Sequence, residues 1–197
     1  VVSEFPVGQV LMPACEAPDE AEKPFLALCA QRRVPVRRLK RGETVELRGG
    51  RLTALHPPPD WPAVHTPNNR SLVLRLEWAG PTILFAGDIE AEAEASLAQT
   101  PCAAEILKVP HHGSNTSSTE ALLAAVQPAH AIVSTGVWRG REMAREEVLE
   151  RYARRGIATW RTDRLGGIRL RLDRDGYRLE GARAARGFPV PHGKRER

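Results

Sequence analysis

Short apolar runs alternate with more polar stretches along most of this chain. The runs that are typical of β-strands cover residues 7–11, 34–39, 44–47, 51–55, 71–78, 82–86, 105–109, 131–134, 157–161, 168–172 and 177–180. Between them lie stretches that predict helices over residues 20–33, 90–99, 119–126 and 145–155. This alternation of strands and helices indicates an α/β domain.

Turn-forming residues divide the pattern further. Ala79-Gly80-Pro81 predicts a tight turn that joins two strands into a hairpin, and Asp175-Gly176 predicts a second hairpin. From Arg183 onward the chain is rich in Arg, Gly and Pro and has little apolar surface to bury. We therefore expect one domain over residues 1–181 and a basic, disordered tail over residues 182–197.

Two of the apolar runs end in side chains that can bind metal ions. Asp88 follows the run 82–86, and His111-His112 follows the run 105–109. Ligands in loops at the C-terminal ends of neighbouring buried strands produce this pattern. A carboxylate can bridge two cations, and neutral imidazole is a common zinc ligand. Asp88, His111 and His112 are therefore the candidate metal ligands and catalytic residues.

Each of these candidates also has an ordinary structural interpretation. A Gly-Asp pair after a strand is often a turn or a helix N-cap, and two histidines can simply lie in a surface loop. Adjacent histidines point in different directions, so we expect one to face a metal while the other contacts substrate or a metal ligand.

Polar residues near these motifs are candidates for binding substrate. Ser114 and Ser117 could hold phosphate oxygens, or they could serve only the start of the next helix. Asn68 and Ser71 could orient a substrate, or they could form an ordinary turn before the strand. Ser118 is expected to cap the helix that begins near residue 119.

Composition limits the function classes. No run approaches 18 consecutive apolar residues, so no membrane-spanning segment is predicted. The net charge of +5 favours a polyanionic partner such as nucleic acid, or it serves solubility alone. The 3 widely spaced cysteines suggest neither a disulfide framework nor a zinc knuckle.

Metal ligands are scarce in this chain. A two-metal hydrolase uses roughly five to seven ligands, whereas the chain has 6 histidines and no His-x-His-x-Asp-His cluster. The chain also begins without an initiator methionine or a signal peptide pattern. We expect it to be a segment of a larger domain, truncated at the N-terminus.

Four motifs together resemble the metallo-β-lactamase-fold domain of ComEC-type DNA-internalisation competence proteins. They are Asn68-x-x-Ser71-Leu72-Val73-Leu74-Arg75-Leu76, Ala86-Gly87-Asp88-Ile89-Glu90 with Glu94, Leu107-Lys108-Val109-Pro110-His111-His112-Gly113-Ser114-x-Thr116-Ser117-Ser118, and Arg161-Thr162-Asp163-x-x-Gly166. The resemblance covers roughly residues 1–180, and the His-His-Gly-Ser segment is its most specific part.

The resemblance implies a four-layer αβ/βα sandwich that holds two divalent metal ions, zinc or manganese. Asp88 corresponds to the bridging aspartate, and His111 and His112 correspond to a late histidine motif. The implied activity is two-metal hydrolysis of the DNA strand that does not enter the cell. The implied partners are single-stranded DNA, a membrane channel domain of the same polypeptide and other competence DNA-uptake proteins. Such a domain would be soluble and attached to a bacterial inner-membrane protein, on its periplasmic or outer face.

Two departures from the family pattern keep other functions open. The first metal motif of the family would lie N-terminal of Val1, and Met143 stands where the family has the histidine of Gly-His-Pro. We therefore expect an incomplete metal site and an inactive fragment. The alternatives are a catalytically inactive DNA-binding or structural module, and a small-molecule metallohydrolase of the same fold that acts on an ester, lactam or thioester.

Overall fold

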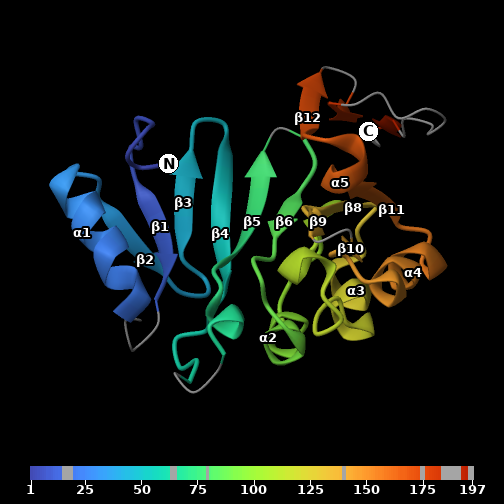
Figure 1. The fold of residues 1–197 in the computed structure, drawn as a ribbon, viewed down its shortest axis with the longest axis horizontal. Helices are drawn as coiled ribbons and strands as arrows, with labels where there is room; N and C mark the ends of the chain where they lie inside the picture. The colour runs from blue at the N-terminus through green and yellow to red at the C-terminus, as the bar shows by residue number, and fades with distance from the viewer. Residues whose placement is uncertain are drawn as a thin grey trace.

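A mixed seven-stranded sheet organises the molecule (Figure 1). The computed structural model describes residues 1–14, 20–62, 66–78, 80–138, 141–173, 176–182 and 192–194. Across the sheet the order is β11 (Ala158–Arg161), β8 (His130–Val133), β7 (Ile106–Lys108), β6 (Ile83–Phe85), β5 (Val73–Trp78), β4 (Gly50–His56) and β3 (Thr44–Leu47). Strands β6, β7, β8 and β11 run parallel, and β3 to β6 pair antiparallel.

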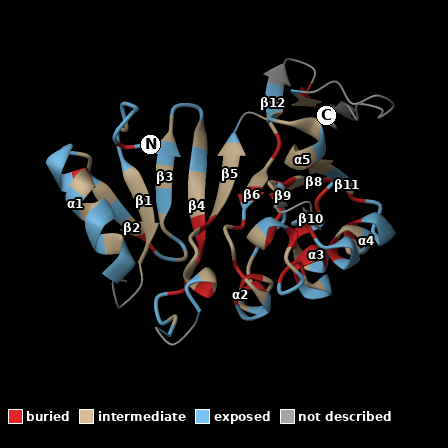
Figure 2. Cartoon of the chain, in the orientation of Figure 1, coloured by how far each residue is buried: buried red, intermediate tan, exposed pale blue. Residues whose placement is uncertain are grey.

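Three helices connect the parallel strands. They are α2 (Ala91–Leu97), α3 (Glu120–Val126) and α4 (Glu146–Arg154). A parallel pair of strands requires such a crossover, and the helices of these crossovers cover the sheet. Leu97, Leu122 and Val148 on the helices are buried in one cluster with Leu84 and Leu107 of the sheet. Figure 2 shows this burial concentrated over the half of the sheet that carries β6 to β8.

A smaller unit lies beside the β3 edge of the main sheet (Figure 1). Strands β1 (Val10–Pro13) and β2 (Val36–Leu39) pair in parallel, with η1 (Glu20–Glu22) and α1 (Lys23–Gln31) between them. Leu39 and Cys29 are fully buried there.

Antiparallel strands cover the other end of the main sheet. They are β12 (Ile168–Asp173), β13 (Gly176–Gly181) and β14 (His192–Lys194). The ring of Tyr177 packs edge-on against His130 of β8, with ring centroids 5.8 Å apart. The centroid of the His130 ring also lies 6.2 Å from that of Trp160 in β11. The three rings of Tyr177, His130 and Trp160 therefore join the hairpin to the sheet.

Most of the elements predicted from the sequence are confirmed, together with the mixed α/β class. Both hairpins form, with β5 against β6 and β12 against β13, although residues 79, 174 and 175 of their turns lie outside the described residues. The first strand was misplaced, because it covers Val10–Pro13 rather than 7–11.

Several short elements were not predicted. They include β9 (Val137–Trp138), β10 (Arg141–Glu142), α5 (Thr162–Leu165) and β14. With two to four residues each, they show no apolar period. Within residues 182–197 the structure describes Ala182 and β14, so the expected domain boundary and disordered tail stay predictions.

The centre of the sheet offers a direct test of the core. Leu84 is fully buried in β6, so Leu84→Ala is expected to lower the free energy of unfolding by about 2–5 kcal/mol through lost burial and a residual cavity. Urea denaturation of the purified chain measures this change. Leu47→Ala in the edge strand β3, where the side chain is only partly buried, is the control and should cost clearly less. Equal losses of unfolding free energy in the two variants would contradict the assignment of Leu84 to the centre of the core.

Candidate metal centre

Asp88 lies in a tight turn directly after β6. Gly87 before it has φ +60°, and a Cβ at this position would lie 2.7 Å from the Cβ of Ser71. Only glycine therefore fits the turn without strain. The backbone N–H of Asp88 donates to Ser71 Oγ at 3.1 Å, which fixes the turn to the start of β5.

His112 faces Asp88 across the ends of β6 and β7. Its Nε2 lies 3.5 Å from Asp88 Oδ1, and both side chains are roughly half exposed. Its Nδ1 lies 2.7 Å from the carbonyl oxygen of Ser134, just after β8. A carbonyl oxygen only accepts, so Nδ1 carries a proton; in the neutral ring, Nε2 then presents its lone pair towards Asp88.

This arrangement fits a metal ion. Two ligand atoms on a tetrahedral zinc, with bonds of about 2.1 Å, are about 3.4 Å apart. The Asp88 Oδ1 and His112 Nε2 atoms have nearly this separation, and the Ser134 carbonyl fixes the tautomer that a metal ligand needs. Asp88 and His112 could therefore hold one cation between them.

His111 has a different set of partners. His111, His112 and Gly113 have φ values of 45°, 56° and 84°, so three consecutive residues are left-handed. The His111 Nδ1 atom lies 3.3 Å from Glu90 Oε1 and 3.2 Å from Thr116 Oγ1. The two adjacent imidazoles thus face different carboxylates. His111 is also held by its backbone N–H, which donates to the carbonyl of Gly87 at 3.2 Å.

Glu90 joins several loops around His111. Its carboxylate accepts hydrogen bonds from Thr116 Oγ1 at 2.8 Å, Asn68 Nδ2 at 3.4 Å and Thr66 Oγ1 at 3.3 Å. Burial works to raise the pKa of Glu90, but these bonds and the nearby His111 outweigh it and hold the pKa below its ordinary value. Glu90 is therefore an ionised partner for the His111 ring.

The structure distributes the four predicted substrate-binding residues over this network. Ser71 supports Asp88, Asn68 donates to Glu90, and Ser114 Oγ lies 3.1 Å from Thr116 Oγ1. Ser117 is buried, and its hydroxyl is within 3.0 Å of the carbonyl of Ser114. Substrate contact by these residues stays a prediction, because their observed contacts are within the protein.

A buried polar cluster closes the histidine loop, residues 110–119. Glu94 of α2 is fully buried and accepts the backbone N–H groups of Ser118 at 2.5 Å and Thr119 at 2.7 Å. The Tyr152 hydroxyl lies 3.0 Å from Ser118 Oγ, and Arg151 donates to the Ser118 carbonyl at 2.6 Å. Burial raises the pKa of Glu94, although the two N–H groups and Arg151 oppose this rise.

The prediction that Ser118 caps α3 was wrong. Thr119 is the N-cap, because its hydroxyl accepts the backbone N–H of Leu122 at 3.3 Å. Ser118 instead has φ 59° and connects the loop to the buried cluster of Glu94, Arg151 and Tyr152.

Removing Glu94 should unfold the histidine loop first. Glu94→Ala leaves the backbone N–H groups of Ser118 and Thr119 without their acceptor and removes the negative charge near the Arg151 guanidinium, so we expect a loss of about 3–5 kcal/mol in unfolding free energy. Glu94→Gln keeps one acceptor oxygen and should lose less. Glu147→Ala on the exposed side of α4 is the control, with an expected change within about 0.5 kcal/mol. Thermal unfolding and amide exchange of residues 118 and 119 measure these effects; unchanged exchange in Glu94→Ala would contradict them.

The segment after β11 supports the carbonyl that orients His112. Thr162 Oγ1 donates to the carbonyl of Thr135 at 2.7 Å and lies 2.8 Å from the backbone N–H of the same residue. Next to it, Arg161 Nε donates to Asp163 Oδ1 at 3.0 Å, and both side chains are nearly buried. The Arg161-Thr162-Asp163 segment therefore fixes the end of β8, where Ser134 contacts His112.

The ion pair between Arg161 and Asp163 predicts a pH dependence of stability. The Arg161 guanidinium holds the pKa of Asp163 below its ordinary value of 3.8. The stabilisation is therefore fully present above pH 3.8 and is lost as the pH falls through the lower, folded-state pKa. Urea unfolding of wild type and Asp163→Asn at several pH values should show a constant difference near neutrality that shrinks in acid. A difference that does not change with pH, or an equal effect in the exposed control Asp60→Asn, would contradict this.

Several residues of the centre were not predicted from the sequence as site residues. Ser134 orients His112 through a backbone carbonyl, which no side-chain motif reveals. Burial lowers the pKa of Lys108 at the end of β7, while the nearby Asp88 carboxylate opposes the shift. A lysine within an apolar strand, directly before the predicted ligand loop, is the signal that could have identified it.

The ligand set in the described part of the chain is small. Within those residues, no group of three or more His, Cys, Asp or Glu side chains is placed to hold one metal ion. Met143 is half exposed, and its backbone N–H donates to the Gly136 carbonyl at 3.1 Å. The assignment of Asp88 and His112 as metal ligands therefore stays a prediction.

A family comparison identifies the fold. The family model described as the metallo-beta-lactamase superfamily matches residues 14–137, which is more than half of the chain. The chain belongs to the metallo-beta-lactamase superfamily. Proteins with this fold usually bind metal ions, in agreement with the Asp88 and His112 geometry. A solved CmlA beta-hydroxylase mutant has the same fold, with a TM-score of 0.50, 13% identity, and coverage of 79% of this chain and 38% of that one.

Curated relatives of this superfamily member include competence proteins. ComE operon protein 3 of Bacillus subtilis is 30% identical over 167 residues, which are 84% of this chain and 21% of that protein. Competence protein ComA of Neisseria gonorrhoeae is 34% identical over 116 residues, 57% of this chain and 17% of that protein. The resemblance to ComEC-type proteins is therefore confirmed, and the chain spans about a fifth of the length of these relatives. None of the helices described here is long and apolar enough to cross a bilayer.

Proposed function

We propose that this metallo-beta-lactamase domain hydrolyses phosphodiester bonds in single-stranded DNA, as part of a protein that takes up DNA. The observation that carries the proposal is the pairing of His112 Nε2 with Asp88 Oδ1 at 3.5 Å, with the imidazole tautomer fixed by Ser134. The names of the competence relatives and the net charge of +5 support DNA as the substrate.

In this proposal Asp88 and His112 hold divalent cations, zinc or manganese, with further ligands from outside the described residues. When bound, two such cations would supply Lewis-acid activation of a water molecule and positive charge for the phosphate oxygens. The protein positions the two ligands through Ser71, which fixes the Asp88 turn, and Ser134, which fixes the His112 ring.

His111 has a separate role in this scheme. Its Nδ1 faces the ionised Glu90 carboxylate at 3.3 Å, and this contact fixes the orientation of the ring. The opposite nitrogen, Nε2, can then form a hydrogen bond with the departing oxygen of the substrate. The assignment of His111 as a metal ligand stays a prediction beside this proposed substrate contact.

The setting of the domain is also proposed from its relatives. The competence proteins that it resembles are several times longer, so we infer that a membrane channel domain belongs to the same polypeptide. The hydrolase domain would then be attached to the bacterial inner membrane on its periplasmic or outer face. There it would act on the non-transported strand together with other competence DNA-uptake proteins.

Loss of Asp88 tests the hydrolase directly. In the intact protein, Asp88→Asn and His112→Ala should each lower the rate of cleavage of labelled single-stranded DNA in zinc or manganese by at least about 100-fold. Asp60→Asn, which changes an exposed aspartate that takes no part in the centre, is the matched control and should retain the rate. A chelator should abolish cleavage by the wild type. Cleavage that persists in Asp88→Asn would refute the proposal, and turnover of a small ester without DNA cleavage would favour a small-molecule metallohydrolase.

Two observations favour a second function. Met143 replaces the histidine that the resemblance implies, and the described residues contain no group of three metal-binding side chains. A domain that kept the fold without catalysis would bind DNA with an affinity that falls with salt and is unchanged by a chelator.

A further inference from the structure

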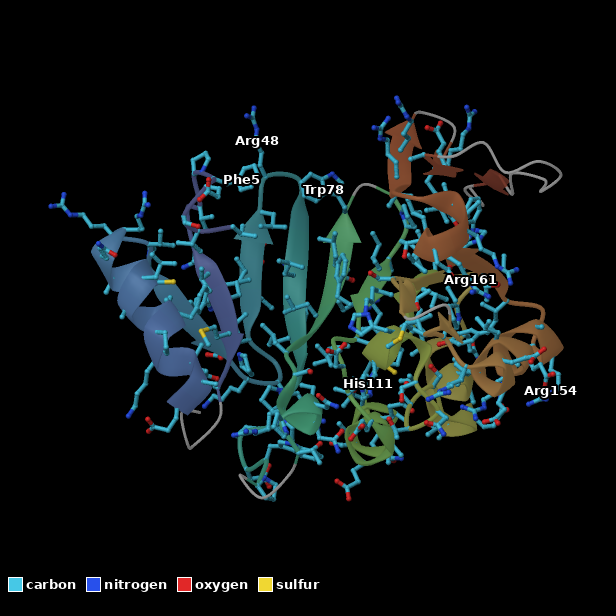
Figure 3. The ribbon with its side chains drawn as sticks, in the orientation of Figure 1. Phe5, Arg48, Trp78, His111, Arg154 and Arg161 are labelled. Atoms are coloured by element: carbon cyan, nitrogen blue, oxygen red, sulfur yellow. The ribbon has the colours of Figure 1, made fainter. Side chains whose placement is uncertain are left out.

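A pocket opens beside Asp88, on the side of the loop that precedes β5. Its volume is about 330 Å³, and its lining includes Arg70, Ser71 and Asp88, with Pro67 and Leu72 from the same loop and Pro13 and Glu22 from the β1 unit. In the view of Figure 3, His111 lies towards one end of the sheet, whereas Arg48 and Trp78 lie at the opposite end. The pocket therefore belongs to the same end of the sheet as the candidate metal centre.

We propose that this pocket binds one nucleotide of a single DNA strand next to the scissile phosphate, with a flanking phosphate held by Arg70. The inference rests on the proposed function and adds Arg70 as a residue that would bind a phosphate of the substrate. A guanidinium can hold two oxygens of one phosphate at once, which makes arginine well suited to this contact.

The loop that carries Arg70 is held rigidly. The neighbouring Asn69 is buried, accepts the Glu90 backbone N–H at 2.8 Å through Oδ1, and donates to Glu92 Oε2 at 3.2 Å through Nδ2. The carbonyl of Asn69 lies 2.9 Å from His56 Nε2. On the other side of Arg70, Ser71 accepts the Asp88 N–H. Arg70 thus starts from a fixed backbone position beside Asp88, so the loop itself needs no ordering when a phosphate binds.

The remaining walls suit a nucleotide better than a small charged metabolite. Pro13, Pro67 and Leu72 supply apolar surface for a sugar or base. The carboxylate of Glu22 is 2.7 Å from Arg38, which also donates to the Pro13 carbonyl at 2.9 Å, so its negative charge is balanced. The volume is at the low end of the range for small-ligand sites, which fits one nucleotide rather than a duplex.

The test measures binding and cleavage separately. A fluorescent oligo(dT) of about ten nucleotides is titrated into the intact protein in the presence of a chelator, at several salt concentrations. Arg70→Ala should weaken binding about tenfold and reduce the slope of log affinity against log salt by about 0.7, the contribution of one phosphate of a single strand. Arg70→Lys keeps the charge without the two-pronged contact, and should retain the slope while recovering only part of the affinity.

Arg171→Ala is the matched control. Arg171 is an exposed arginine of β12, with Nε 3.0 Å from Glu180 Oε2, and it does not line the pocket. Affinity and slope in this variant should match the wild type. Unchanged binding in Arg70→Ala, or equal losses in Arg70→Ala and Arg171→Ala, would overturn the pocket assignment.

The outcomes separate the two proposals. Binding that depends on Arg70, without cleavage that depends on Asp88, would retain the pocket and refute the hydrolase. Cleavage that depends on Asp88, with the same affinity and KM in Arg70→Ala as in the wild type, would retain the hydrolase and refute the pocket.

Discussion

The buried carboxylate of Glu94 is the interaction on which the candidate centre depends. It accepts two consecutive backbone N–H groups at the end of the histidine loop, where Ser118 has a left-handed conformation. His111 and His112 are left-handed too, and such residues cost on the order of 1–3 kcal/mol each unless the surroundings hold them. The hydrogen bonds of Glu94, Arg151 and Tyr152 supply that restraint, and the histidines can then face Glu90 and Asp88.

The parallel strands determine where these groups meet. Because β6, β7 and β8 run in the same direction, Asp88, His112 and Ser134 all follow the C-terminal ends of adjacent strands. Side-chain ligands and a backbone carbonyl come together at that edge although they are far apart in sequence. The core beneath, with Leu84 and Leu107, keeps the strand ends in register.

The sequence allowed this convergence to be predicted because apolar runs ended in Asp88 and in the His111-His112 pair. It did not reveal the partners that give each histidine its role. Those partners are the Ser134 carbonyl for His112 and the Glu90 carboxylate for His111. Which histidine faces which partner depends on left-handed backbone angles, and the hydrophobic pattern of a sequence does not encode such angles. The Thr119 cap was missed for a similar reason, since neighbouring Ser and Thr residues are both common caps and only the contact of Ser118 with Glu94 distinguishes them here.

The contact between Glu94 and the histidine loop also determines which segments must be transplanted together into another protein. Hydrogen bonds within residues 110–119 are not the only ones that hold the loop, because its end is secured by a carboxylate from α2 and by two side chains of α4. Transplanting the loop alone into another scaffold would transfer the histidines without their orientation. A transplant that keeps this orientation would need the loop together with the turns of α2 and α4 that contact it.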